Sequence, residues 1–197
     1  MKAGKWVNLT CSVFIVSPCL IPISAGIAKA QEVAWQRIVG LQVAGDLVGS
    51  GTGTVTGAVP WTTTNGNAEA DLDSGNVRFQ VEGLVLAVGS AGALTGLPIG
   101  TTAGVTEIKG TLVCGVNGSV GGNSVLIDTP AVPLNGLGNA SFAGNVGSLP
   151  AVCDAASNDA FLIRIVDPVA FADAWIAFGA VPVTENHHKF GNPMMDK

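Results

Sequence analysis

Short segments that alternate apolar and polar residues recur along this chain, and clusters of glycine and proline separate them. The chain has 27 glycines and 10 prolines among its 197 residues, whereas long runs with the helical period are absent. A period of two is typical of half-buried strands, and glycine or proline clusters mark their ends. The pattern predicts an all-β fold: a single antiparallel β-sandwich or barrel-like domain of about nine strands, with one disulfide. The expected strands cover residues 35–43, 52–59, 105–115, 124–128, 139–146, 160–166 and 174–181, together with two hairpin arms flanking Ser74 and Gly75.

The expected hairpin lies in the segment ADLDSGNVRFQVEGL, residues 70–84. With the Ser-Gly pair at its tip, Leu72 faces Val77 on the apolar side, and Asp71 faces Arg78 on the polar side. A shift of one residue would turn every apolar side chain toward solvent, so the pattern strongly constrains which residues share a face.

Asp71 and Asp73 in the same segment alternate as the first ligands of a calcium loop do. Calcium takes about six to eight oxygen ligands, and here an apolar strand follows instead of further acidic positions. We therefore interpret this segment as a turn, and we expect no metal or cofactor site.

The first 30 residues are expected to be a signal peptide that is removed on export. A basic start with Lys2 and Lys5 precedes a long apolar run, and small residues at Ala28 and Ala30 suit cleavage. The alternative is a membrane anchor, but prolines interrupt the run, so we expect a secreted protein, extracellular or periplasmic, without stable membrane insertion. The expected organisation is a cleaved signal peptide (1–30), an all-β domain (31–183) and a polar, mobile C-terminal tail (184–197).

The chain expected after cleavage is acidic. Three of the nine basic residues and none of the 14 acidic ones lie in the leader, which leaves a formal charge of −8. An acidic surface without a basic patch repels polyanions, so nucleic acid is excluded as a partner.

Cys114 and Cys153 are the two cysteines that remain after removal of the leader. In an oxidising compartment two such cysteines are expected to form a disulfide. The alternation places Cys114 on the inward face with Ile108 and Leu112. A metal site is the alternative, but it would need histidine or carboxylate partners at suitable spacing.

The segments 160–166 and 174–181 are apolar on both faces, apart from Arg164. Strands that are buried on both faces read as nearly continuous apolar runs. We therefore expect these two strands to be central in the sheet and to pair through the connection between them, which Asp167 and Pro168 begin.

The side chains needed for common catalytic sites are scarce. The chain has no tyrosine, and no histidine precedes His187, so a Ser-His-Asp site within the domain is excluded unless the tail folds back. The DTP sequence at Asp128 resembles the turn of aspartic proteases. Proline replaces the glycine of that turn and no second copy exists, so we interpret it as a strand end. His187 and His188, near Glu185, are interpreted as part of a solvated tail instead of a metal site.

Trp61 is the main candidate for ligand contact. It is flanked by threonines and asparagines, and an exposed tryptophan in such a setting stacks on sugar rings while its neighbours form hydrogen bonds. The alternative is that its ring folds back onto the sheet and covers an apolar edge. The candidate contact residues are Trp61, Thr62, Asn65 and Asn67.

The segments WQRIVG, EADLDSGNVRFQVEGL, IKGTLVC, FLIRI and WIAFGAV resemble small secreted bacterial all-β proteins to which no function is assigned. The resemblance covers most of the chain after the leader, and its motifs are structural. It implies an exported all-β domain.

Together these patterns predict a non-catalytic secreted β-sandwich protein that serves as an envelope, matrix or surface-assembly component. The first alternative is an extracellular glycan-binding module centred on Trp61, and the second is a hydrolase that uses carboxylates. Expected partners are a glycan or another envelope protein. The sequence leaves the oligomeric state open, although exposed edge strands between glycine-rich segments are candidates for assembly.

Overall fold

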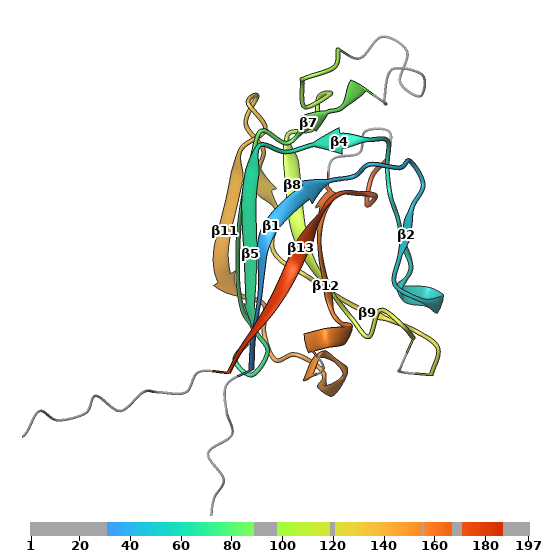
Figure 1. The fold of residues 1–197 in the computed structure, drawn as a ribbon, viewed down its shortest axis with the longest axis vertical. Coiled ribbons are helices and arrows are strands. Elements are labelled where there is room, and N and C mark those ends of the chain that lie inside the picture. Colours follow the sequence, from blue (N-terminus) through green and yellow to red (C-terminus); the bar gives the residue numbers. More distant parts are fainter. Residues whose placement is uncertain (1–30, 89–97, 119–120, 155, 167–170, 187–197) are drawn as a thin grey trace, which may run out of the picture.

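The computed structural model describes residues 31–88, 98–118, 121–154, 156–166 and 171–186. These residues form an all-β domain without an α-helix (Figure 1), as the alternating pattern predicted. The strands are β1 (Gln31–Gly40), β2 (Leu47–Val48), β3 (Val55–Thr56), β4 (Trp61–Thr62), β5 (Asn65–Asp71), β6 (Asn76–Glu82), β7 (Val85–Leu86), β8 (Glu107–Cys114), β9 (Val125–Asp128), β10 (Val132–Pro133), β11 (Ala140–Asn145), β12 (Ala160–Ile165) and β13 (Trp175–Asn186). The 3-10 helices are η1 (Gly51–Gly53), η3 (Ala151–Asp154) and η4 (Ala156–Asn158).

Nine strands form one antiparallel sheet in the order β10-β8-β12-β13-β1-β5-β6-β11, and β9 also pairs with β8. The sheet curls (Figure 1), and β6 meets β8 and β12 across its apolar interior. Phe79 of β6 and Phe161 of β12 have ring centroids 5.7 Å apart. A Cβ on Gly110 of β8 would lie 2.7 Å from the Phe161 ring and 2.9 Å from the Phe79 ring. Glycine at this position therefore lets the opposite walls of the sheet come into contact.

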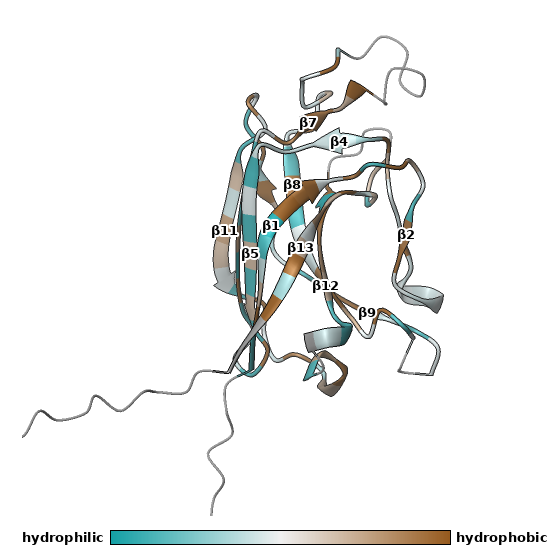
Figure 2. Cartoon of the chain, viewed as in Figure 1, coloured by the Kyte–Doolittle hydropathy of each residue, from teal (hydrophilic) through white to brown (hydrophobic). Residues whose placement is uncertain are grey.

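Four aromatic rings run through this interior from one edge of the sheet to its centre. Phe142 of β11 stacks on Phe79 at 6.1 Å, Phe79 contacts Phe161, and Phe161 contacts Trp35 of β1 at 5.5 Å. Burial alternates along β5 and β6, as the hairpin pattern requires, and the hydropathy colouring in Figure 2 alternates along β5. The rings and the apolar face of the hairpin form one core.

The two apolar segments that were predicted to be central occupy that position. β12 lies between β8 and β13, and β13 lies between β12 and β1. β12 and β13 pair antiparallel, with Ile163 opposite Ala177. Cys114 at the end of β8 is bonded to Cys153 of η3, with a Cα–Cα distance of 4.8 Å. The predicted disulfide is thus confirmed, and it closes a loop across 39 positions.

The hairpin of β5 and β6 has the predicted faces but not the predicted register. Asp71 faces Asn76 and Glu69 faces Arg78, so the tip is the four-residue turn 72–75. The Asp71 carboxylate accepts hydrogen bonds from the N–H groups of residues 73 and 74, each at 3.0 Å, and Gly75 adopts φ +73°. The aspartate side chain therefore selects a four-residue loop centred one position earlier, which shifts the pairing by two residues and preserves both faces.

Two further expectations are corrected. Residues 52–59 contain η1 and the two-residue strand β3 in place of a long strand. β13 continues past the expected domain boundary at Val183, because Asn186 pairs with Gln31. The tail therefore starts no earlier than residue 187, and the remainder of it, including His187 and His188, lies outside the described residues. No helix in the described ranges is long and apolar enough to cross a membrane.

Candidate functional site

Trp61 is buried, which overturns the expectation of an exposed stacking platform. Its side chain is 2% exposed, and its backbone N–H donates to the Leu41 carbonyl at 2.8 Å. A Cβ on Gly40 would collide with the Trp61 carbonyl, so β1 and β4 approach closely at this point. The alternative interpretation, a ring folded back against the sheet, matches the structure. The Trp61 ring therefore has no exposed face on which a sugar could stack.

The polar neighbours of Trp61 are exposed but do not gather around it. Thr62 faces Val85 at the short β4–β7 pairing, and Asn65 lies at the start of β5 opposite Glu82. Asn67 alone among the candidate contact residues lines a described hollow of the surface. The structure therefore moves the candidate site from Trp61 to the outward face of the hairpin.

Two adjoining hollows cross the outward face of β1, β5, β6 and β11, and we call them together the outer groove. Their volumes are about 450 Å³ and about 360 Å³. They meet at Arg78 and Ala143, which line both. Amide and hydroxyl groups prevail in the first hollow and carboxylates in the second. The first is lined by Asn67, Arg78, Phe79, Gln80, Ser141, Phe142 and Ala143, and the second by Glu32, Glu69, Asp71, Asn76, Val77, Arg78, Ala143 and Gly144.

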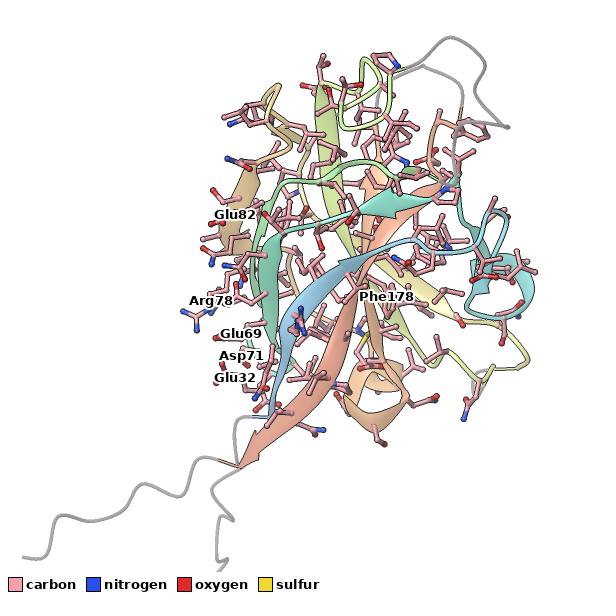
Figure 3. The ribbon with its side chains drawn as sticks, turned by 45° about the horizontal axis from the view of Figure 1, so that its top comes forward. Glu32, Glu69, Asp71, Arg78, Glu82 and Phe178 are labelled. Atoms are coloured by element: carbon pink, nitrogen blue, oxygen red, sulfur yellow. A yellow bond between two sulfur atoms is a disulfide. The ribbon has the colours of Figure 1, made fainter. Side chains whose placement is uncertain are left out.

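Charges in the outer groove are partly paired. Arg78 Nε donates to Glu69 Oε2 at 2.7 Å, and Arg78 Nη2 contacts the same oxygen. Figure 3 shows Glu69, Asp71 and Arg78 side by side on the outward side of the sheet. The Arg78 side chain is 68% exposed, so this ion pair adds little stability.

Asp71 is held as a carboxylate by the turn that it caps. A hydrogen bond from the Ser74 side chain lowers its pKa below the ordinary value, and the backbone N–H groups of Ser74 and Asp73 add to this shift. A general acid needs the opposite shift, toward a raised pKa. Asp71 therefore suits binding better than proton donation.

The strand β11 forms one margin of the sheet, and its outward side is unpaired. The Val146 N–H donates to the Gly75 carbonyl at 2.9 Å, which fixes the alternation of the β6–β11 ladder. Even-numbered residues of β11 bond to β6, and odd-numbered residues direct their N–H and C=O groups away from the sheet. No hydrogen bond from any described residue to these outward groups is present between Ser141 and Asn145. We call the stretch Ser141–Asn145 the open edge.

The opposite margin consists of β9 and β10, both paired to β8, and we call it the interrupted edge. Pro130 and Pro133 break it, and Asp128 places a charge at the end of β9. The DTP sequence is thus a strand end, as predicted. Proline and charge are the features by which natural sheets block edge pairing.

A charged cluster lies beside the interrupted edge. Asp128 accepts from Thr111 Oγ1 at 2.7 Å, from Lys109 Nζ at 2.8 Å and from Arg164 Nη1 at 3.2 Å, and Asp173 accepts from Lys109 Nζ at 2.9 Å. Burial would lower the pKa of Lys109, but its hydrogen bonds to the two aspartates outweigh this effect and raise it. The charges in this cluster are matched, which gives it a structural role.

Asp159, located just before β12, is a buried acidic residue. Its Oδ1 accepts from the Gly115 N–H at 3.2 Å, whereas Oδ2 has no partner among the described residues. Burial, with a smaller contribution from the charge of Asp154, raises its pKa to about 7. The side chain is enclosed, since the residue is 8% exposed. It therefore affects stability and does not face a ligand.

Within the described part of the chain, no group of three or more His, Cys, Asp or Glu side chains is arranged to hold a metal ion. Searches of protein-family models, curated proteins and solved structures gave no match to this chain. The outer groove and the open edge are the surface features of the described residues that could contact a ligand or another chain. Strand 139–146 was predicted, but its position at the margin of the sheet follows only from the three-dimensional pairing.

Proposed function

We propose that this chain is a non-catalytic secreted component of a cell-envelope, matrix or surface assembly, and that it acts by strand pairing through the open edge. The observation that carries the proposal is the unprotected outward side of β11. Residues 140–145 contain no charge and no proline, and they pair with β6 without a bulge. An exposed edge strand without charge, proline or bulge is a template for pairing with another chain.

Two other features support this proposal. The disulfide between Cys114 and Cys153 fits an oxidising compartment, as does the expected leader. The expected net charge of −8 keeps the domain soluble and away from polyanions until a specific pairing forms. An assembly component with a rigid sheet and one free edge needs no catalytic side chains.

Glycan binding is a second candidate function, with the site in the outer groove instead of at Trp61. The supporting observation is the hollow lined by Asn67, Gln80 and Ser141, whose amides and hydroxyl suit hydrogen bonding to sugars. The variant Gln80→Ala is the appropriate probe, since Trp61→Ala would disturb the core. Loss of binding on a glycan array by Gln80→Ala, with an unchanged melting temperature, would favour this candidate.

The assembly role is tested in the producing organism with the full chain. We expect the wild-type protein to co-fractionate with envelope or extracellular matrix material. The variant Ser141→Pro removes one outward N–H group of the open edge, and it should shift the protein to the freely soluble fraction. Ser141→Ala keeps the N–H group and is the matched control. Equal partitioning of the wild type and Ser141→Pro would contradict the proposal.

A further inference from the structure

When two copies of the open edge are placed antiparallel with Ala143 opposite Ala143, the side chains that face each other are compatible. We propose that the partner of the open edge is a second copy of this chain, paired antiparallel across a two-fold axis at Ala143. This inference rests on the proposed function, because it names the partner of the same edge. The stretch is Ser-Phe-Ala-Gly-Asn, residues 141–145.

The backbone geometry fixes the register of this pairing. Ser141, Ala143 and Asn145 direct their N–H and C=O groups outward, as the alternation of the β6–β11 ladder requires. In an antiparallel pair centred on Ala143, this residue faces its own copy, and Ser141 faces the partner's Asn145. Each facing pair then exchanges two hydrogen bonds, so about six backbone hydrogen bonds join the two sheets.

The start of the open edge is also set by the structure. Asn139, the next outward-facing residue before Ser141, already exchanges hydrogen bonds with Asn135: its carbonyl accepts from the Asn135 N–H at 3.1 Å, and its N–H donates to Asn135 Oδ1 at 3.0 Å. The opposite end is held as well, since Asn145 Nδ2 donates to the Ser74 carbonyl at 2.7 Å. The unpaired stretch is thus held at both ends and pairs with β6 without a bulge between them, which pre-organises it for pairing.

Side chains on the outward face are compatible with this register. The exposed side chain at the axis is the methyl group of Ala143, which meets its copy without charge or bulk. Ser141 meets the partner's Asn145, and both side chains are polar and neutral. Uncharged, small or hydrogen-bonding partners directly across an antiparallel pair avoid the repulsion that like charges would cause.

On the inward face, the register places Phe142 beside the partner's Gly144. Phe142 is half-buried, and its ring lies over Gly144 of its own strand, where a Cβ would approach the ring to 2.8 Å. An aromatic ring that covers a glycine on a neighbouring strand is a recognised means of stabilising sheet edges. Pairing would bury the part of the Phe142 ring that the isolated domain leaves exposed.

The nearest charges do not oppose the pairing. Arg78 faces Ala143 across the β6–β11 ladder, so the two copies of Arg78 would be separated by three strand spacings, about 14 Å. This distance exceeds the Debye length of about 8 Å at physiological salt. Each Arg78 is also paired with Glu69 of its own chain. Because five residues per copy bury little surface, we expect a weak, concentration-dependent dimer.

The test uses the purified mature protein and opposite charges at the axis. The variants Ala143→Glu and Ala143→Lys each place like charges face to face in a homodimer, and each should weaken self-association at least about tenfold in analytical ultracentrifugation. An equimolar mixture of the two should restore association to the wild-type level or above. The matched controls are Asn67→Glu and Asn67→Lys, which alter the same face two strands away and should leave association unchanged. Equal melting temperatures establish that all variants fold.

The outcomes separate this inference from the proposed function. A wild-type protein that stays monomeric at millimolar concentration, or a mixture that does not restore association, overturns the second-copy inference. If Ser141→Pro still releases such a protein from envelope material, the open edge pairs with a different chain and the proposed function stands. Self-association through Ala143 without any retention in envelope or matrix material would instead overturn the proposed function.

Discussion

The two margins of the sheet are built in opposite ways. The interrupted edge is broken by prolines, carries Asp128 and is backed by a cluster of matched charges beside the disulfide-bonded strand β8. The open edge is a continuous six-residue strand without proline or charge. Both margins belong to one curled sheet, and β10 of the interrupted edge contacts β11 of the open edge. The difference shows that proline and charge interrupt one margin of the sheet, whereas the other margin carries neither.

The largest effect is expected on the side of the interrupted edge, at the disulfide. The double variant Cys114→Ser, Cys153→Ser should lose about 3–4 kcal/mol of unfolding free energy, because the bond restricts a 39-position loop in the unfolded chain. Urea denaturation measures this loss. Reductant should destabilise the wild type to the same degree and leave the double variant unchanged. A loss below about 1 kcal/mol would show that β8 does not depend on the bond.

Proline substitutions along β11 test which side of the strand is free. Ala140→Pro removes an N–H group that bonds to β6 and should cost about 3 kcal/mol, whereas Ser141→Pro removes an outward N–H group and should cost less than about 1 kcal/mol. The two positions are adjacent and both side chains are small, so each variant is the control for the other. Similar losses in thermal unfolding would mean that the outward side of β11 is paired.

Substitution of two arginines compares a buried charge near the interrupted edge, Arg164, with an exposed charge near the open edge, Arg78. The Arg164 side chain is 9% exposed and Arg78 is 68% exposed. Arg164→Met should cost about 2 kcal/mol, because it leaves Asp128 and Asp173 with one cation fewer. Arg78→Met should change the free energy of unfolding by less than about 0.5 kcal/mol. Chemical denaturation measures both losses of unfolding free energy. Equal losses in the two variants would contradict this prediction.

The buried carboxyl group of Asp159 should make the stability of the domain depend on pH. Because its folded-state pKa is raised to about 7 from an ordinary value of 3.8, the folded protein binds this proton more tightly than the unfolded chain. Its contribution is fully present below about pH 4 and is lost as the pH rises through about 7, with a slope of up to about 1.4 kcal/mol per pH unit. In Asp159→Asn this slope should disappear from melting curves recorded between pH 4 and 7. An identical pH profile in the variant and the wild type would contradict the assignment.

Much of the fold followed from local patterns. The segments that became β12 and β13 are apolar on both faces, and only a central position buries both faces of a strand. The disulfide followed from the expected oxidising compartment and from the two cysteines that remain after the leader. The faces of the β5–β6 hairpin were also correct, because a two-residue shift keeps each side chain on its side.

The remaining features depend on contacts between distant parts of the chain or on side-chain details of single turns. The hairpin register was missed because the Asp71 carboxylate, not the Ser-Gly pair, determines the loop. Trp61 is buried because β4 packs against the end of β1 at Gly40, and no local pattern reveals that contact. The open edge likewise appears only when the strand order is known. The absence of charge and proline in 140–145 was its one visible signal.

The pairing of β1 with β13 has a consequence for how this chain reaches its folded state. The first and last strands of the described domain lie side by side at the centre of the sheet, from Gln31 opposite Asn186 to Gly40 opposite Ala177. A sheet whose central ladder joins the first and last strands of the described domain has a high contact order and folds slowly. The central β1–β13 ladder can therefore form only after the last strand of the described domain has been synthesised. A translocation channel that threads unfolded polypeptide would receive this chain in the form that it can transport.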